Sequence, residues 1–219
     1  MSQQILIVGL GQFGMSLART LSEKGVEVLA VDRRKDLVEE ASTFVTEAVA
    51  LDATDETELA RLHPGRRDAA VCAIGDDSKE ASIICTALLR QMGAPWVIAR
   101  TNSATYRRIL QLVGAHQVVN PEQEFGRRFA NRLIYRHVVS DMPLGDELHL
   151  TEICVQPSMI GKNLVELALP KRFGVMVVAI RRGAPSKIVQ PSPNEPLQAN
   201  DNLIIVSNDT AIQKLAGGL

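Results

Sequence analysis

Short apolar runs alternate with longer amphipathic segments along the first 120 residues of the chain. The apolar runs have the length of buried strands, and the longer segments have helical spacing. Six strands are predicted over residues 3–8, 26–31, 45–51, 68–74, 95–100 and 116–119, with helices over 15–21, 36–42, 56–62, 78–92 and 105–113. This alternation predicts βαβ units and therefore an α/β fold built on a doubly wound parallel sheet.

A further helix is predicted over residues 123–138, and its apolar residues fall on one face. These are Phe125, Phe129, Leu133 and Ile134. Two interpretations of this apolar stripe remain open. Either it packs on the sheet of its own chain, or it docks on a neighbouring subunit.

The residues after this helix have a different composition and predict a second, smaller domain. Residues 140–145, Ser-Asp-Met-Pro-Leu-Gly, are expected to form a linker. Strands over 149–155, 174–182 and 203–206, with helices over 161–169 and 210–215, then predict a small α+β domain. The predicted domains are residues 1–139, which include the long helix, and residues 146–219. A core of about 75 residues is marginal by itself and usually packs against a partner.

The composition narrows the class of protein. Charged residues make up 22% of the 219 residues and the net charge is −1, so no positive field favours a nucleic-acid partner. No apolar run approaches the roughly 18 residues that a membrane-spanning helix needs, and the N-terminus lacks the layout of a signal peptide. We therefore expect a cytoplasmic protein, whose membrane role would run through a partner. The three cysteines form no C-x-x-C pair and the four histidines lack metal-site spacing, so we expect reduced, buried thiols.

The strongest chemical pattern lies at the first strand–helix junction. Gly9, Gly11 and Gly14 form G-x-G-x-x-G between a predicted strand and a predicted helix, which is the context of a Rossmann-like dinucleotide fold. Gly9 permits the tight turn, Gly11 lets backbone N–H groups approach a phosphate, and Gly14 lets the helix pack closely on the strand. The second strand ends in Asp32, about twenty residues past the glycines, where a carboxylate would bind a ribose. The pattern predicts an adenine-nucleotide site, and the alternative is a glycine turn that only packs a helix.

Other residues would complete this site, because ligands of open parallel sheets bind at the carboxyl ends of the strands. These residues are Gln12 and Phe13 of the glycine loop, Arg33, Asp52, Ala53, Thr54, Ala73, Ile74, Gly75, Arg100 and Glu122. Ala53 and Ile74 would flank an adenine, and the Asp32 carboxylate would repel the 2′-phosphate of NADP. Arg100 would neutralise phosphates or form a surface ion pair. Glu122 would bind a divalent cation near the phosphates or compensate the dipole of the helix that it starts.

Catalytic groups are missing from the same regions of the sequence. A dehydrogenase needs a side chain that moves a proton while the cofactor moves a hydride. Neither Tyr106 nor Tyr135 is followed four residues later by a lysine, and no cluster of His, Asp and Ser follows the dinucleotide unit. The sequence therefore favours a nucleotide sensor over an enzyme. A small NAD-dependent oxidoreductase and a free-standing sensor with another partner are the alternatives.

The motifs keep a fixed order along nearly the whole chain. The first domain has Ile7-Val8-Gly9-Leu10-Gly11-x-Phe13-Gly14, then residues 28–32, 52–56, 71–75, Arg100 and 113–115 leading to 121–122. The second domain has Gly161-Lys162-x-Leu164-x-Glu166-Leu167, then residues 177–183 and 201–206. In this order and spacing the chain resembles the cytoplasmic regulatory subunits of bacterial Ktr/Trk potassium uptake systems, which are built from an N-terminal and a C-terminal RCK domain.

The resemblance implies a nucleotide-binding RCK domain with a C-terminal crossover helix over residues 1–139, and a regulatory RCK domain over residues 146–219. It implies domain-swapped dimers that assemble into an octameric ring beneath a membrane potassium-translocating subunit of the KtrB or TrkH type. ATP and ADP, or NAD and NADH as the alternative, would bind the N-terminal domains and open or close the pore. These nucleotides must differ in affinity between two ring states, since equal affinity shifts no equilibrium.

Two positions and one segment bear on the ligand that this resemblance implies. The Ktr pattern has an arginine at the position of Gln12, where it reaches a terminal phosphate across the dimer, and a neutral amide is a weaker phosphate partner. Glu122 matches the acidic residue that helps to hold a divalent cation, Mg²⁺ or Ca²⁺, between two nucleotides. Some relatives bind cyclic di-AMP through a polar segment after the short helix of the second domain. Residues 169–176 lack much of that polar pattern, which disfavours cyclic di-AMP.

Overall fold

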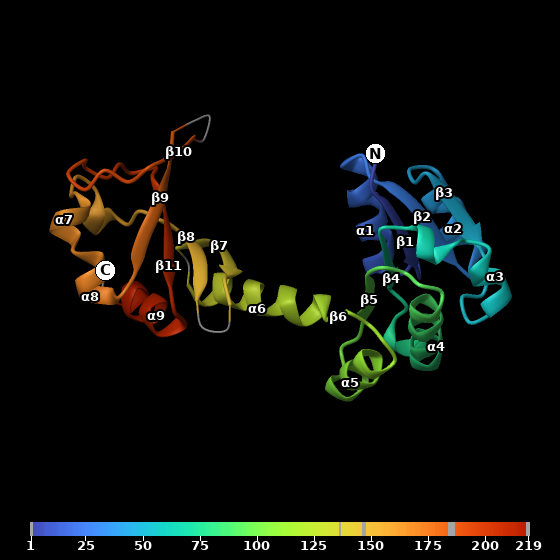
Figure 1. Cartoon of the computed structure of the whole chain (residues 1–219). Helices are drawn as coiled ribbons and strands as arrows, with labels where there is room; N and C mark the ends of the chain where they lie inside the picture. Colours follow the sequence, from blue (N-terminus) through green and yellow to red (C-terminus); the bar gives the residue numbers. More distant parts are fainter. Residues whose placement is uncertain (1, 136, 146–147, 184–186, 218–219) are drawn as a thin grey trace. The chain divides into compact units, whose positions relative to one another are not determined.

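The computed structural model describes residues 2–135, 137–145, 148–183 and 187–217. The chain divides into two compact units, residues 1–123 and 124–219, each with its own sheet and hydrophobic core (Figure 1). Among the described residues, no helix has the length and apolarity needed to cross a membrane. The domain limits 1–139 and 146–219 stay a prediction, and residue 146 lies outside the described residues.

The first unit is built on a parallel sheet. Its strands are β1 (Gln4–Val8), β2 (Glu27–Asp32), β3 (Glu47–Ala50), β4 (Ala69–Cys72), β5 (Val97–Arg100) and β6 (Gln117–Val119). Its helices are α1 (Gln12–Glu23), α2 (Lys35–Ser42), α3 (Glu56–Ala60), α4 (Lys79–Gln91) and α5 (Ala104–Leu112). The strands lie in the order β3-β2-β1-β4-β5-β6, and every neighbouring pair is parallel. This is the doubly wound order of Rossmann-like folds, so the predicted fold class is confirmed.

Helices cover both faces of this sheet, which explains why its central strands are continuously apolar. Ile7 belongs to a core cluster with Ala18 of α1 and Val38 of α2. Leu6, one residue earlier in β1, belongs to the cluster that contains Leu89 of α4. Successive residues of a strand point to opposite faces, so each face of β1 needs its own apolar residues.

The second unit is a small antiparallel sheet with short helices. Its strands are β7 (Val138–Pro143), β8 (His149–Cys154), β9 (Met176–Arg182), β10 (Lys187–Val189) and β11 (Asn202–Ser207). Its helices are α7 (Leu164–Leu167), α8 (Leu169–Phe173) and α9 (Asp209–Gly217), and α6 (Pro121–Ile134) crosses the limit between the units. The strand order is β10-β9-β11-β8-β7, and the neighbouring pairs are antiparallel. The predicted small α+β domain is confirmed as a fold class.

The predicted linker over residues 140–145 is wrong, because most of it belongs to β7, which pairs with β8 at the edge of the second sheet. The buried Asp141 carboxylate in β7 accepts hydrogen bonds from Asn131 Nδ2 at 2.9 Å and from Thr151 Oγ1 at 3.0 Å. It also lies 3.3 Å from His149 Nδ1. The pairing with β8 and the bonds to buried Asp141 thus hold as a strand a segment whose composition is typical of a loop.

Other differences concern the ends and the shortest elements. Helix α6 ends at Ile134 instead of Val138. It starts at Pro121, because the Asn120 side chain accepts the N–H of Gln123 at 3.0 Å and caps the helix. Helix α8 and strand β10 were not predicted, since each is short and depends on its neighbours, as the pairing of β10 with β9 shows.

Replacing Asp141 with alanine is expected to destabilise the second unit. The change leaves the half-buried side chain of Asn131 and the buried side chain of Thr151 without this acceptor, at a cost of about 2–4 kcal/mol. The measurement is the free energy of opening of the β7 and β8 amides, obtained by hydrogen exchange on the full chain. Glu124→Ala removes an exposed carboxylate from α6 and should leave this free energy unchanged. Equal exchange in the two variants would contradict the role given to Asp141.

Candidate functional site

A cleft opens at the carboxyl edge of the parallel sheet, where the strand order reverses. The chain runs from β1 outward to β2 and β3 and then returns to β4 on the other side of β1. Helices α1 and α4 pack into different core clusters, on opposite faces of the sheet, and a crevice remains between the loops that precede them. The cleft has a volume of about 650 Å³ and is lined by residues at or after the ends of β1 to β5.

Most of the predicted site residues line this cleft. They are Gly9, Gly11, Gln12, Asp32, Arg33, Asp52, Ala53, Thr54, Ala73, Ile74, Gly75 and Arg100. Phe13, Gly14 and Glu122 do not line it, although Phe13 and Glu122 contact Arg100 and Gly14 packs on Gly9. The fold therefore gathers residues from five strand ends into one place, and their roles toward a ligand stay predictions.

The glycine loop needs glycine at two positions for steric reasons. Gly9 has a φ of +98°, and a Cβ there would lie 2.8 Å from the Ile74 N atom. A Cβ on Gly14 would collide with the carbonyl oxygen of Gly9, because α1 packs directly on the loop. A Cβ on Gly11, by contrast, would meet no described atom within 4 Å. Gly11 therefore leaves open space that a ligand can occupy.

The first turn of α1 borders the cleft, since Gly11 and Gln12 line it. Gly11 is the N-cap residue, and it has no side chain to accept the first N–H groups of the helix. The first turn contains no acidic residue. Unpaired N–H groups and the positive end of the helix dipole together suit the binding of a phosphate.

Asp32 joins the end of β2 to the glycine loop. Its Oδ2 accepts a hydrogen bond from the Leu10 N–H at 2.6 Å, and its Oδ1 accepts one from the Arg34 N–H at 2.9 Å. An ionised carboxylate has about four acceptor sites, so two remain for further donors. Because Asp32 lines the cleft, those sites are within reach of ligand hydroxyl groups.

The β3 side of the cleft combines an ionised acid with apolar surface. Asp52 Oδ1 accepts hydrogen bonds from the Thr54 N–H at 2.9 Å and the Thr54 hydroxyl at 2.7 Å. These bonds, assisted by the charge of Arg33, hold the pKa of the Asp52 carboxyl below its ordinary value, although burial opposes the shift. Ala53 is buried and Ile74 half-buried, and both line the cleft as apolar surface of the kind that a base stacks on.

Arg100 is the cation at the β5 side of the cleft, and its side chain is only 17% exposed. The guanidinium forms an ion pair with Glu122 in the first turn of α6, and its carbon lies 5.7 Å from the centroid of the Phe13 ring. Its Nε is buried and has no hydrogen-bond partner among the described residues. A buried donor without an acceptor is costly, so this atom favours an acceptor supplied by a ligand or by water. Arg100 thus forms the predicted ion pair and also borders the cleft.

Helix α4 forms part of the cleft that the sequence analysis missed. Glu80, Ala81 and Ile84 line the cleft from one face of this helix. Arg34 before α2 and Leu37 in its first turn also line it. Ile84 is apolar yet 37% exposed. A helix that starts at the reversal of strand order turns one face to the crevice. An exposed apolar residue in the second turn of such a helix is the sequence signal that could have identified α4 as part of the cleft.

The residues that line the cleft are suited to binding a polar ligand. Neither histidine, cysteine nor tyrosine is among the described lining residues. No three His, Cys, Asp or Glu side chains in the described ranges gather into a metal site. Cys72 and Cys85 are buried as expected, whereas Cys154 is exposed at the end of β8, so the expectation of buried thiols is wrong for Cys154. The cleft combines carboxylates, arginines, the start of α1 and apolar surface.

Comparisons with known families agree with the two units. The TrkA-N domain family matches residues 5–121, which contain the parallel sheet and the cleft. The TrkA-C domain family matches residues 150–217, which contain most of the antiparallel sheet.

Individual relatives are similar over nearly the full chain. The Ktr system potassium uptake protein C of Bacillus subtilis (strain 168) is 32% identical over 98% of this chain and 96% of its own length. The Ktr system potassium uptake protein A of Vibrio alginolyticus is 36% identical over 93% of this chain and 92% of its own length. Among solved structures, the GsuK channel bound to NAD has a TM-score of 0.64 at 18% identity. The match covers 98% of this chain and 39% of the channel chain. At this low identity the similarity supports the fold alone.

Gly9→Ala and Gly11→Ala are expected to differ in stability. Alanine at position 9 adopts a positive φ and meets the β4–α4 turn, which should lower the free energy of unfolding by about 2–4 kcal/mol. Alanine at position 11 has open space and should cost about 1 kcal/mol or less, as a weaker N-cap residue. Urea unfolding of both variants measures the difference. A larger loss for Gly11→Ala than for Gly9→Ala would contradict the geometry of the loop.

Proposed function

The chain belongs to the protein family that combines a TrkA-N domain with a TrkA-C domain, and from this premise we propose that it is a nucleotide-binding regulatory subunit of a potassium uptake system. The observation that carries the proposal is the cleft with its glycine loop and Asp32, in a chain similar over 98% of its length to a Ktr potassium uptake protein. In this function an adenine nucleotide binds in the cleft and biases an assembly of subunits between two states. The assembly lies against the cytoplasmic side of a membrane potassium-translocating subunit and changes its opening.

The proposed binding mode places each part of the nucleotide against a matching surface. The ribose hydroxyls donate to the free lone pairs of Asp32, and the adenine lies between Ala53 and Ile74. The phosphates bind at the N-terminus of α1, where Gly11 leaves room for them. The Asp32 carboxylate repels a 2′-phosphate, which favours ATP, ADP or NAD over NADP.

ATP and ADP are the proposed ligands, with NAD and NADH as the alternative. The unpaired Nε of Arg100 supports an anion at the β5 side of the cleft, which a phosphate supplies. NAD stays an alternative because the GsuK channel, which shares the fold, is bound to NAD. Cyclic di-AMP is not proposed, since within residues 169–176 the side chains of Leu169 and Phe173 are buried in the core of the second unit.

A divalent cation, Mg²⁺ or Ca²⁺, is proposed only in combination with a nucleotide. Glu122 is the candidate ligand, and its side chain is 55% exposed and paired with Arg100. The described residues of one chain offer no cluster of three ligating side chains around it. One chain therefore does not fit a cation by itself, and phosphates and a second copy of the chain must complete the coordination.

The ion pair between Arg100 and Glu122 couples the cleft to helix α6. A phosphate that binds Arg100 competes with Glu122 for the same guanidinium. Glu122 is the second residue of α6, so occupation of the cleft changes the contacts that hold the start of this helix. The proposed output is therefore a change of structure on binding, without a chemical product.

The apolar stripe of α6 supports a homo-oligomer. No residue of α6, all of which the structure describes, is buried, so the second sheet does not cover the stripe. Phe125 and Phe129 stack with their ring centroids 5.7 Å apart, and Leu133 and Ile134 are 67% and 66% exposed. We propose that a second copy covers this face, forming the dimer from which an octameric ring is built.

The first test measures thermal protection by nucleotides. ATP, ADP, NAD and NADH are added to the full chain, with and without Mg²⁺ or Ca²⁺, and at least one should raise the melting temperature. Gly11→Val fills the space at the phosphate position, so this variant should fold and lose the protection. The absence of protection in the unmodified chain would reject the proposed function. Consumption of NADH with carbonyl compounds would instead support an oxidoreductase.

The second test concerns assembly. Phe129→Asp places a charge in the middle of the apolar stripe, and burial of an unpaired carboxylate is costly, so the dimer should dissociate to monomers at micromolar concentration. Sedimentation velocity measures the oligomeric state. Glu124→Ala, also on α6 but outside the stripe, is the matched control and should assemble normally. Unchanged assembly of Phe129→Asp would show that another surface holds the subunits together.

A further inference from the structure

A small cavity adjoins the cleft near the ends of β4 and β5. Lys79 and Tyr106 line this cavity, which shares Ile74, Gly75 and Arg100 with the cleft. Its volume of about 10 Å³ is close to that of one water molecule. Lys79 and Tyr106 therefore border the candidate site, although neither lines the cleft itself.

An aromatic ring holds the side chain of Lys79 in this position. Lys79 is the first residue of α4, and its Nζ lies 4.8 Å from the centroid of the Tyr106 ring, which is a cation–π distance. Within the described ranges no carboxylate forms an ion pair with Lys79. Lys79 is a half-buried residue beside the site, and its charge stays available to an anion.

Two of the three arginines among the described lining residues of the cleft have acidic partners. Arg34 pairs with Asp36, and Arg100 pairs with Glu122. Gln12, at the start of α1, is neutral. At the β5 side of the cleft, a polyphosphate would therefore meet the guanidinium of Arg100, whose positive charge is largely countered by Glu122.

Acidic residues make a further cation necessary on the β4 side. Asp77 and Glu80 are exposed and line the cleft on either side of Lys79 in the sequence, and their charges oppose a phosphate. Arg33, which also lines the cleft, follows Asp32 at the end of β2, on the other side of β1. Lys79 is thus the described cation best placed to offset these charges near Gly75.

We propose that Lys79, positioned by Tyr106, recognises the outermost phosphate of a nucleoside polyphosphate and so sets the preference of the site for long phosphate chains. The inference rests on the proposed nucleotide-binding function and adds a specificity-determining residue to it. Lys79 and Gly75 line the same small cavity, so a phosphate held near Gly75 would lie beside the Lys79 side chain. Tyr106 lowers the entropy cost by keeping the ammonium close to that place.

The test compares ATP with AMP by titration calorimetry on the full chain. Lys79→Met keeps the long unbranched side chain and its contact with the ring but removes the charge. ATP binding should weaken roughly tenfold or more, because a charge-assisted phosphate contact is lost. AMP binding should change by less than about twofold, because its single phosphate stays at the N-terminus of α1.

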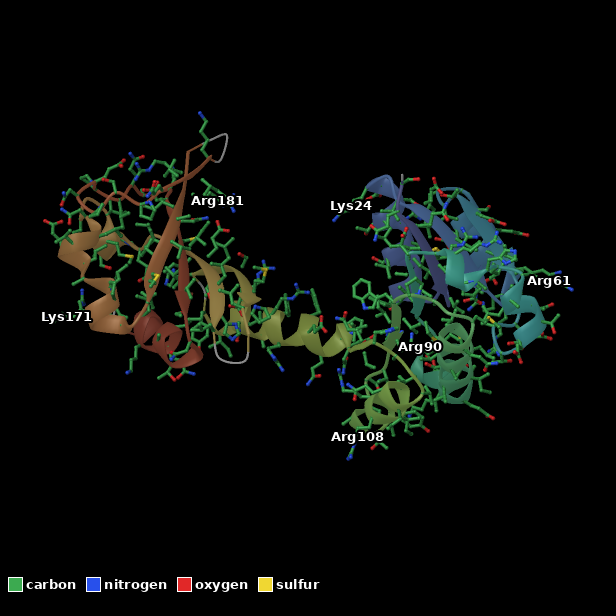
Figure 2. All side chains as sticks on the ribbon, in the orientation of Figure 1. Lys24, Arg61, Arg90, Arg108, Lys171 and Arg181 are labelled. Carbon is green, nitrogen blue, oxygen red and sulfur yellow. The ribbon has the colours of Figure 1, made fainter. Side chains whose placement is uncertain are left out.

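Two controls separate this role from general effects of charge and packing. Lys24→Met removes an exposed lysine at the far end of α1, labelled in Figure 2, and should leave both affinities unchanged. Tyr106→Phe keeps the ring face and should bind ATP like the unmodified chain. Tyr106→Leu removes the ring and should weaken ATP binding more than AMP binding.

The outcomes distinguish this inference from the proposed function. If the unmodified chain binds neither ATP nor AMP, the proposed function itself fails. If it binds them and Lys79→Met keeps the ATP-to-AMP affinity ratio, the inference about Lys79 is wrong and the nucleotide site stands. An equal loss of affinity for ATP and AMP would also overturn the inference, because it would show that Lys79 supports the structure of the cleft and does not recognise the outermost phosphate.

Discussion

The close approach of the glycine loop to the β4–α4 turn is the constraint on which the cleft depends. Gly9 touches the backbone of Ile74 so closely that no side chain fits between them, and α1 packs directly on Gly9 through Gly14. These contacts fix the N-terminus of α1 at the point where the strand order reverses. The helix donors, the Asp32 carboxylate and the apolar surface of Ala53 and Ile74 can surround one ligand only while this packing holds. Gly9 and Gly14 are therefore required by the packing of the protein itself, whether or not a ligand is bound.

The first unit could be predicted because local pattern and tertiary fold agree there. The G-x-G-x-x-G loop and Asp32 lie at fixed distances along the chain, and the reversal of strand order brings them together. The resemblance drawn from the motifs is confirmed by the two family matches. Strand β7 could not be predicted, because the burial of Asp141 depends on Asn131 and Thr151, which the sequence does not place near it. Likewise the exposure of Ile84 follows from the crevice beside α4 and not from its own spacing.

For Arg100, the sequence predicted the location of the side chain at the end of β5 better than it predicted the role of its charge. The sequence left a phosphate contact and an ion pair as alternatives, and the structure places the side chain where both interactions are within reach. Its guanidinium pairs with Glu122 and lies near the face of Phe13, while Nε is buried without an acceptor. Such an arrangement fixes the orientation of the side chain before a ligand arrives, which lowers the entropy cost of binding an anion. The two alternatives are therefore compatible, and a ligand would decide how the charge of Arg100 is shared.

Helix α6 is held at its two ends and exposed between them. Its start is capped by Asn120 and tied to the cleft by Glu122, and Asn131 near its end binds the buried Asp141 of β7. No residue of this fully described helix is buried, and helices shorter than about 12–15 residues are marginal in water without packing. A helix of 14 residues with stacked phenylalanines on its open face needs a second surface to be stable. In the proposed homo-oligomer a second copy supplies that surface, between the bonds of Glu122 to Arg100 and of Asn131 to Asp141. Assembly and occupation of the cleft would then act on the same helix.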